Sequence, residues 1–277
     1  PMELLGLEWW QVLIVLLAGF WAGTINSVVG SGTLVTFPTL VAVGFPPVTA
    51  QMSNAIGLVA AGFSGTWGYR RELREAGTIA RKLTWGSLAG GLIGATLLMQ
   101  LPATVFEYAA PILIVFAILF VVFQPRLNAW VRRRRQADGD EPISPEVSPL
   151  PSGKVTPALF ILVFLTGIYG GYFVAAQGVL LMGILGVFMT TGTLVHANAI
   201  KTWLSLAVNL IAATGYLLFA FDRIDWTAVL LIAVSSLIGG SLGARIGRRI
   251  KATVLRMVIV IVGIAGIINM VLPLING

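Results

Sequence analysis

Cysteine is absent from this chain of 277 residues, and histidine occurs only once. The absence of cysteine excludes disulfide bonds, thiolate catalysis and cysteine-based metal sites. With one histidine and 11 acidic residues, a catalytic metal centre is not expected. The sequence also offers no pairing of a nucleophile with a base. We therefore expect no enzymatic activity, no bound metal and no cofactor.

Charged residues are also scarce, which argues against a soluble protein. They make up 10% of the chain, whereas soluble domains usually contain about 25%. Hydrophobic residues make up 57%, more apolar surface than a soluble chain of this size could bury. The net charge of +7 does not indicate nucleic acid, because the basic residues lie in short loops between apolar runs. The expected partners are the lipid bilayer and a small substrate, with no nucleic acid.

Ten apolar runs predict an all-α polytopic membrane protein made of two halves of about five helical segments each. We expect a first membrane repeat over residues 1–123, a flexible linker over 124–155 and a second membrane repeat over 156–277. The runs in the first half cover residues 9–29, 33–43, 48–69, 83–100 and 103–123. Those in the second half cover residues 156–177, 179–189, 194–220, 226–247 and 252–273.

The two halves match in sequence as well as in plan, which indicates an internal duplication. Asn54-Ala55-Ile56 recurs as Asn198-Ala199-Ile200 at an offset of 144 residues. Three glycines of the first half recur in the second at a constant offset of 148 residues. These pairs are Gly19 and Gly167, Gly23 and Gly171, and Gly30 and Gly178.

Equivalent loops of the two halves carry opposite charge, which predicts an inverted-topology repeat. The loop 70–82 is basic and is expected to be cytoplasmic, whereas its counterpart, 221–226, carries two acids and is expected outside. The turn at 101–103 is uncharged, but its counterpart contains four basic residues. These are Arg245, Arg248, Arg249 and Lys251. The plasma membrane is thus the expected location, with both termini outside and the linker inside.

Glycines interrupt the apolar runs at equivalent places, within Asn26–Thr33 and Val174–Gly178. A broken helix exposes backbone N–H groups, and with the helix dipole these attract an anion. Such breaks in repeated halves point to a transporter site near the membrane midplane. The alternative is that the glycines only permit close helix packing. The predicted substrate contacts are Gly30, Gly32 and Gly178 through the backbone, and Asn26, Ser31, Thr33 and Gln177 through side chains.

Lys201 is the only cationic residue placed well inside an apolar run, and its counterpart in the first half is Gly57. A buried cation in hydrocarbon costs about 2.5 to 3.5 kcal/mol on insertion scales. The side chain is therefore expected either to face a substrate cavity or to reach an interface. Asn54 and Asn198 occupy matching places, and either line the substrate site or hydrogen-bond across helices. We include all three among the predicted substrate-binding residues.

Several motifs resemble the TauE/SafE sulfite-exporter family. In the first half these are Leu17–Asn26, Val29–Leu34, Phe37-Pro38 and Trp67–Leu73, and in the second half Tyr169–Phe173, Ala176–Gly178 and Asn198–Lys201. The resemblance implies two homologous membrane halves and transport of sulfite, organosulfonates or other small organic anions. One difference is that Ala175-Ala176-Gln177-Gly178 replaces a glycine-rich run with a following proline.

The sequence therefore predicts a secondary transporter that exports small anions across the plasma membrane by alternating access. An anion channel of the same architecture is the alternative. No carboxylate lies deep in an apolar run, so no coupling-ion ligand is predicted. The identity of the anion and the existence of a homodimer stay open.

Overall fold

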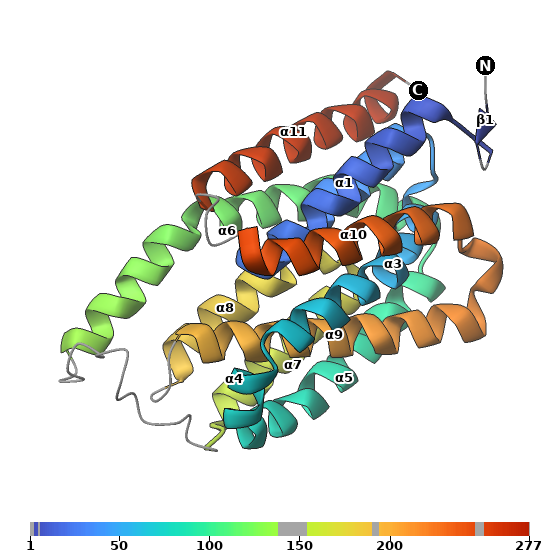
Figure 1. The fold of residues 1–277 in the computed structure, drawn as a ribbon. Helices are drawn as coiled ribbons and strands as arrows, with labels where there is room; N and C mark the ends of the chain where they lie inside the picture. The colour runs from blue at the N-terminus through green and yellow to red at the C-terminus, as the bar shows by residue number, and fades with distance from the viewer. Residues whose placement is uncertain (1–2, 5, 138–153, 190–193, 247–251, 277) are drawn as a thin grey trace.

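The protein is an assembly of helices, described by a computed structural model over residues 3–4, 6–137, 154–189, 194–246 and 252–276 (Figure 1). A small hairpin of β1 (Glu3–Leu4) and β2 (Leu7–Glu8) comes first. The first half then contains α1 (Trp9–Val28), α2 (Thr33–Ala42), α3 (Pro47–Gly68), α4 (Arg70–Glu75), α5 (Gly77–Gln100) and α6 (Ala103–Ala137). The second half contains α7 (Pro157–Tyr172), η1 (Val174–Ala176), α8 (Gln177–Phe188), α9 (Leu194–Phe219), η2 (Phe221–Arg223), α10 (Trp226–Ile246) and α11 (Ala252–Asn276).

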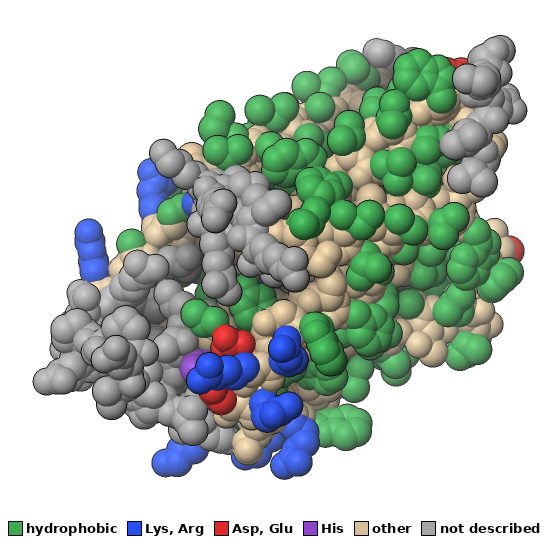
Figure 2. Space-filling view, viewed as in Figure 1, with side chains coloured by type: hydrophobic (Ala, Val, Ile, Leu, Met, Phe, Trp, Pro, Cys, Tyr) green, Lys and Arg blue, Asp and Glu red, His purple; other side chains and the backbone are tan. Residues whose placement is uncertain are grey.

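The predicted fold class, an all-α polytopic membrane protein, is confirmed. Within the described residues, four helical stretches are long and apolar enough to cross a bilayer: Trp9–Val28, Ala103–Leu127, Val195–Phe219 and Thr253–Leu272. Hydrophobic side chains cover much of the visible exterior between the two ends of the bundle (Figure 2). In water such a surface would drive association, whereas in a bilayer it faces lipid.

Two sequence expectations about loops were wrong in part. The basic stretch 70–82 is mostly helical, because α4 occupies its first half and α5 begins at Gly77. The expected linker starts later than residue 124, because α6 continues to Ala137 despite Pro125. In that extension Gln124 is buried, and a Cβ on Gly183 of α8 would lie 2.7 Å from Leu127. Residues 138–153 of the linker and residues 247–251, with three of the four predicted basic residues, lie outside the described part.

Glycines allow the closest helix pairs to form. A Cβ at Gly23 of α1 would lie 2.2 Å from the carbonyl oxygen of Ser236 on α10. A Cβ at Gly94 of α5 would lie 2.1 Å from the carbonyl oxygen of Ile168 on α7. In membranes, small residues at such contacts let backbones approach and strengthen van der Waals packing. In the structure, Gly23 and Gly94 therefore serve close helix packing.

Each main contact between a helix of the first half and a helix of the second half has an equivalent contact in which the two halves exchange roles. α1 packs on α10 while α7 packs on α5, and α3 packs on α10 while α9 packs on α5. Likewise α2 packs on α11 and α8 packs on α6. Gly62 faces Leu206 and Gly65 faces Thr202, so α3 and α9 run in opposite directions.

The bundle has one basic end. Arg70, Arg71 and Arg74 on α4 and Arg81 and Lys82 at the start of α5 gather there, and Figure 2 shows most of the visible Lys and Arg side chains at that end. The acidic loop that carries Asp222 and Asp225 follows α9, whereas α4 contacts the beginning of α9. The basic stretch and the acidic loop therefore lie at opposite ends of α9.

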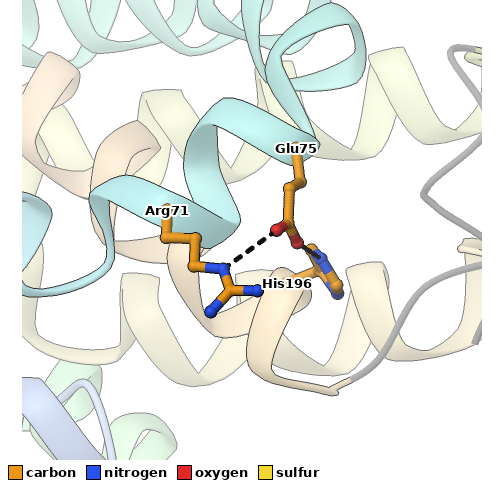
Figure 3. A network of polar contacts seen from close by, with 3 residues as sticks. All are labelled: Arg71, Glu75 and His196. Atoms are coloured by element: carbon orange, nitrogen blue, oxygen red, sulfur yellow. Dashed lines mark hydrogen bonds and ion pairs between the residues drawn. The ribbon is translucent and has the colours of Figure 1, made fainter. Parts of the chain in front are cut away.

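A polar network ties α4 to α9 at the basic end (Figure 3). The buried His196, in the first turn of α9, donates from Nε2 to Glu75 Oε2 at 2.8 Å. Arg71 Nε donates to Glu75 Oε1 at 3.3 Å. The hydrogen bond from His196 is the main reason that the pKa of the Glu75 carboxyl lies below its ordinary value of 4.5.

The Glu75 network predicts a small pH dependence of stability. Because the pKa of Glu75 is lowered in the folded protein, its stabilising contribution is complete above 4.5 and is lost as the pH falls through the lowered value. Glu75→Gln should therefore lower the melting temperature near pH 7 by a few degrees at most, since exposed ion pairs contribute little. It should also flatten the decline in melting temperature below about pH 5. Thermal unfolding in detergent measures both effects, and Glu72→Gln on the same helix is the control. Identical pH profiles of Glu75→Gln and the unmodified chain would contradict the assignment.

Candidate functional site

The first half contributes a helical hairpin whose tip lies inside the protein. The chain reverses at Val29–Gly32, and Gly30 adopts φ 93°, a conformation that favours glycine. Asn26 Oδ1 accepts a hydrogen bond from Gly32 N at 2.8 Å and so holds the turn that precedes α2. Gln11 Nε2 donates to the carbonyl of Val43 at 3.1 Å. Helix α2 therefore returns to the end at which α1 begins.

The second half builds a corresponding hairpin from α7, η1 and α8. The turn η1 breaks the helix after Tyr172, and Gln177 starts the returning helix. The Gln177 side chain lies against Gly170, where a Cβ would be 2.4 Å from its amide carbon. The break predicted from the sequence at Val174–Gly178 thus separates two helices, and the glutamine folds back onto the first of them.

The two hairpin tips meet at Gly30 and Gly178. A Cβ on Gly178 would lie 2.2 Å from the carbonyl oxygen of Gly30, so only glycine fits. A Cβ on Gly30 would lie 3.1 Å from the Gly178 Cα and 3.2 Å from Lys201 Nζ. The contact therefore brings the backbone breaks of both halves beside the amino group of Lys201.

A cavity of about 40 Å³ lies at this junction. By its volume it holds a few water-sized groups. The hairpins supply Asn26, Ser27, Gly30, Thr33, Val174, Gln177 and Gly178 to its lining. Helix α3 supplies Leu58, Ala61, Gly62 and Gly65, and α9 supplies Lys201, Thr202, Ser205, Leu206 and Asn209.

Lys201 brings a positive charge to the cavity. Its side chain is 2% exposed, so it does not reach an interface. Nζ donates to the backbone carbonyl of Asn26 at 3.2 Å. Within the described residues, no carboxylate forms an ion pair with it. An ammonium held by a neutral carbonyl in an apolar bundle favours an anion beside it and disfavours a cation.

Two buried amides in the cavity lining retain hydrogen-bonding capacity. Gln177 is 1% exposed, and neither its Nε2 nor its Oε1 has a partner in the described structure. Asn209 is 6% exposed, and its Oδ1 is likewise unsatisfied. An unsatisfied buried polar atom costs about 1 to 3 kcal/mol. The lining therefore contains donor and acceptor groups suited to a small polar ligand.

Six of the ten predicted substrate-binding residues line the cavity: Asn26, Gly30, Thr33, Gln177, Gly178 and Lys201. The other four, Ser31, Gly32, Asn54 and Asn198, do not belong to the lining. Asn54 Nδ2 donates to Thr33 Oγ1 at 3.3 Å, and Asn198 Nδ2 donates to the carbonyl of Ser27 at 3.5 Å. Both asparagines thus hydrogen-bond across helices, which was the alternative interpretation of the pair.

The sequence interpretation missed four polar lining residues, Ser27, Thr202, Ser205 and Asn209. Lys201, Ser205 and Asn209 follow one another at intervals of four residues on α9. That interval places them on one face of a helix. The spacing of four residues from Lys201 could therefore have predicted Ser205 and Asn209 as lining residues.

The contact between the hairpin tips predicts that Gly178 does not tolerate a side chain. Gly178→Ala should lower the melting temperature, because the added Cβ meets the Gly30 carbonyl and overpacking costs about 1 to 3 kcal/mol. Gly215→Ala is the matched control, since it is also buried in a helix but its Cβ would meet only Met99 at 3.4 Å. Thermal unfolding in detergent compares the two variants. Equal melting temperatures would show that the tips can separate without cost.

Comparison with known proteins places the chain among membrane transporters. The family described as "Sulfite exporter TauE/SafE" matches residues 15–270. A Sinorhizobium protein named "Probable membrane transporter protein ORF9" is 29% identical over 90% of this chain and 87% of its own length. A "Probable membrane transporter protein" of Haemophilus influenzae is 27% identical over 90% of this chain and 89% of its own length. The Escherichia coli "Probable membrane transporter protein YfcA" is 26% identical over 90% of this chain and 84% of its own length.

No solved structure matches the chain. The family match covers nearly all the described helices, including both hairpins and Lys201. It agrees with the resemblance that the sequence motifs indicated. The chain therefore belongs to the TauE/SafE family of membrane transporters.

Proposed function

We propose that this membrane transporter exports small anions, such as sulfite, organosulfonates or related organic acids, by alternating access. The observation that carries the proposal is the buried Lys201 ammonium in a cavity between two hairpin tips, with no ion-pairing carboxylate among the described residues. An anion at Lys201 would offset the cost of burying the charge. The unsatisfied amides of Gln177 and Asn209 could hydrogen-bond its oxygens.

The packing of the tips favours a carrier over the alternative channel. Gly30 and Gly178 are in van der Waals contact, and the cavity beside them is small. A channel needs a continuous polar path, whereas a carrier encloses its substrate and moves one part against another. The hairpins are the proposed moving parts, because the chain in each one turns back at a tip that lies beside the cavity.

Export is the proposed direction because the membrane potential favours it. With the interior negative, moving one negative charge outward gains about 2.3 kcal/mol per 100 mV. None of the described residues that line the cavity is acidic, so no side chain there is suited to a coupling proton or sodium ion. The potential alone would then drive the outward flux of a monoanion.

The proposed topology is an inverted repeat, with 1–123 and 156–277 as the repeats and 124–155 as a connection between them. The exchange of helix pairs between halves supports it. So does the opposite direction of α3 and α9, which carry the matching Asn-Ala-Ile sequences. Under the positive-inside rule the basic end of the bundle is cytoplasmic. Helix α1 begins and α11 ends on one side of the molecule (Figure 1), which we propose is the outside.

Single cysteines test this topology against a native background without cysteine. Thr78 is exposed at the basic end, and Asp222 is exposed in the loop after α9. In intact cells, Thr78→Cys should resist a membrane-impermeant thiol reagent, while Asp222→Cys should react. After permeabilisation both should react, which controls for accessibility. Labelling of Thr78→Cys in intact cells would overturn the proposed orientation.

Replacing Lys201 tests the anion site itself. Lys201→Met keeps the apolar stem and removes the charge, so affinity for sulfite should fall about tenfold or more, as expected for loss of a charge-assisted hydrogen bond of roughly 1.5 to 3 kcal/mol. Lys201→Arg should restore only part of the affinity, because the guanidinium is larger and planar. The readouts are binding to purified protein and flux in proteoliposomes with a defined potential.

Lys154→Met is the control, because it removes an exposed lysine outside the cavity lining. Correct insertion of each variant is checked by thermal unfolding. A Lys201→Met protein that folds, binds and transports like the unmodified chain would show that the lysine is structural. Loss of binding for sulfonates but not for sulfite would narrow the substrate class rather than move the site.

A further inference from the structure

A groove lies beside α4 at the basic end, away from the cavity that contains Lys201. It has a volume of about 440 Å³ and lies between α4, the first half of α5 and α9. We call it the α4–α5 groove. Its lining consists of Leu73, Gly77, Ala80, Arg81, Thr84, Trp85, Leu88 and Trp203. None of these residues belongs to the lining of the Lys201 cavity.

The side chains that α5 contributes to the groove change from charged to aromatic to aliphatic with distance from the basic end. Along α5, going away from the basic end, Arg81 is followed one turn later by Trp85 and after another turn by Leu88. Trp85 is 70% exposed, as is common for tryptophans at a membrane surface. The order of charge, interfacial aromatic and aliphatic side chain is the order of headgroup, glycerol and acyl chain in a phospholipid.

Arg81 supplies a positive charge suited to a phosphate. Within the described residues no carboxylate forms an ion pair with it, whereas Arg71 on α4 is paired with Glu75. Basic residues next to membrane-spanning helices attract anionic lipid headgroups, and pockets between helices can hold them. The rest of the lining is mainly apolar, which does not suit a soluble phosphate compound.

A second groove on the other side of α4 repeats this chemistry. It has a volume of about 340 Å³ and contains Arg70, Arg74 and Trp67 in its lining. The Arg70 guanidinium carbon lies 5.1 Å from the centre of the Trp67 ring. Leu73 lines both grooves, so α4 lies between them. Basic side chains therefore line a groove on each side of the short helix.

We propose that the α4–α5 groove binds an anionic phospholipid from the leaflet at the basic end. The phosphate lies at Arg81, and an acyl chain lies along Trp85 and Leu88. Trp203 forms the inner wall, where its Nε1 donates to Thr84 Oγ1 at 2.8 Å. Trp203 is two residues beyond Lys201 on α9, so the bound lipid touches the helix that carries the cavity lysine.

A matched pair of charge variants tests the headgroup contact. The full chain is reconstituted in bilayer discs of phosphatidylcholine and phosphatidylglycerol, and co-purified lipids are counted by native mass spectrometry. The unmodified chain should retain phosphatidylglycerol in preference to phosphatidylcholine. Arg81→Gln should weaken that retention about fivefold, the usual effect of one basic residue near a membrane surface. Lys82→Gln removes the adjacent charge, which lies outside the groove lining, and should retain the lipid.

A second variant narrows the groove on the headgroup side of Arg81 without changing charge. Gly77 lines the groove, and a Cβ there would have no atom within 4 Å, so Gly77→Leu should be accommodated and should occupy part of the groove. It should reduce phosphatidylglycerol retention while leaving the melting temperature in detergent unchanged. Glycerol phosphate, which has the headgroup but no chains, should neither bind nor raise the melting temperature of the unmodified chain.

Three results would overturn the proposal: no preference for phosphatidylglycerol, equal loss in Arg81→Gln and Lys82→Gln, or full retention in Gly77→Leu. Binding of glycerol phosphate alone would instead identify a soluble-phosphate site and would also overturn it. None of these outcomes depends on transport. The anion-export proposal therefore stands or fails separately.

Discussion

The contact between Gly30 and Gly178 is the constraint on which the interior of the protein depends. The carbonyl of Gly30 occupies the place that any Cβ at position 178 would need. Because neither residue has a side chain, two hairpin tips from different halves of the chain can touch. Helix α9 then passes beside the junction with Lys201 facing it. A larger residue at either tip would separate the hairpins and enlarge or destroy the cavity.

The charge of the buried Lys201 restricts what can lie beside it. An ammonium in a bilayer protein needs neutralisation, hydration or a route to the interface. Among the residues that the structure describes, Lys201 has a single hydrogen-bond partner, the neutral carbonyl of Asn26, and it remains inside the bundle. The unsatisfied amides of Gln177 and Asn209 extend this pattern, because they provide neutral groups without opposing charge. Under the proposed function, a bound anion would neutralise this ammonium.

Predictions from local sequence were correct where the structure of a segment depends mainly on its own residues. Apolar runs and glycine breaks predicted all the main helices, and the motif near Asn26 predicted the break before α2. They failed at α4 and at the end of α6, where polar, arginine-rich stretches form helices instead of loops. Arginine is a good helix former, and α4 is additionally held by the hydrogen bond between Glu75 and His196. That partner lies 121 residues away and cannot be read from the local pattern.

The sequence by itself determined the membrane class, the ten apolar segments, the positions of the breaks and the one deeply placed cation. These features follow from composition and short-range spacing, because the bilayer requires each segment to be apolar along its length. Only the tertiary structure decided which polar residues share a cavity. It placed Asn209 in the lining and gave Asn54 and Asn198 hydrogen bonds across helices. The physical reason is that the cavity is assembled from side chains of four separate parts of the chain, whose rotation and depth depend on the packing of helices far apart in sequence.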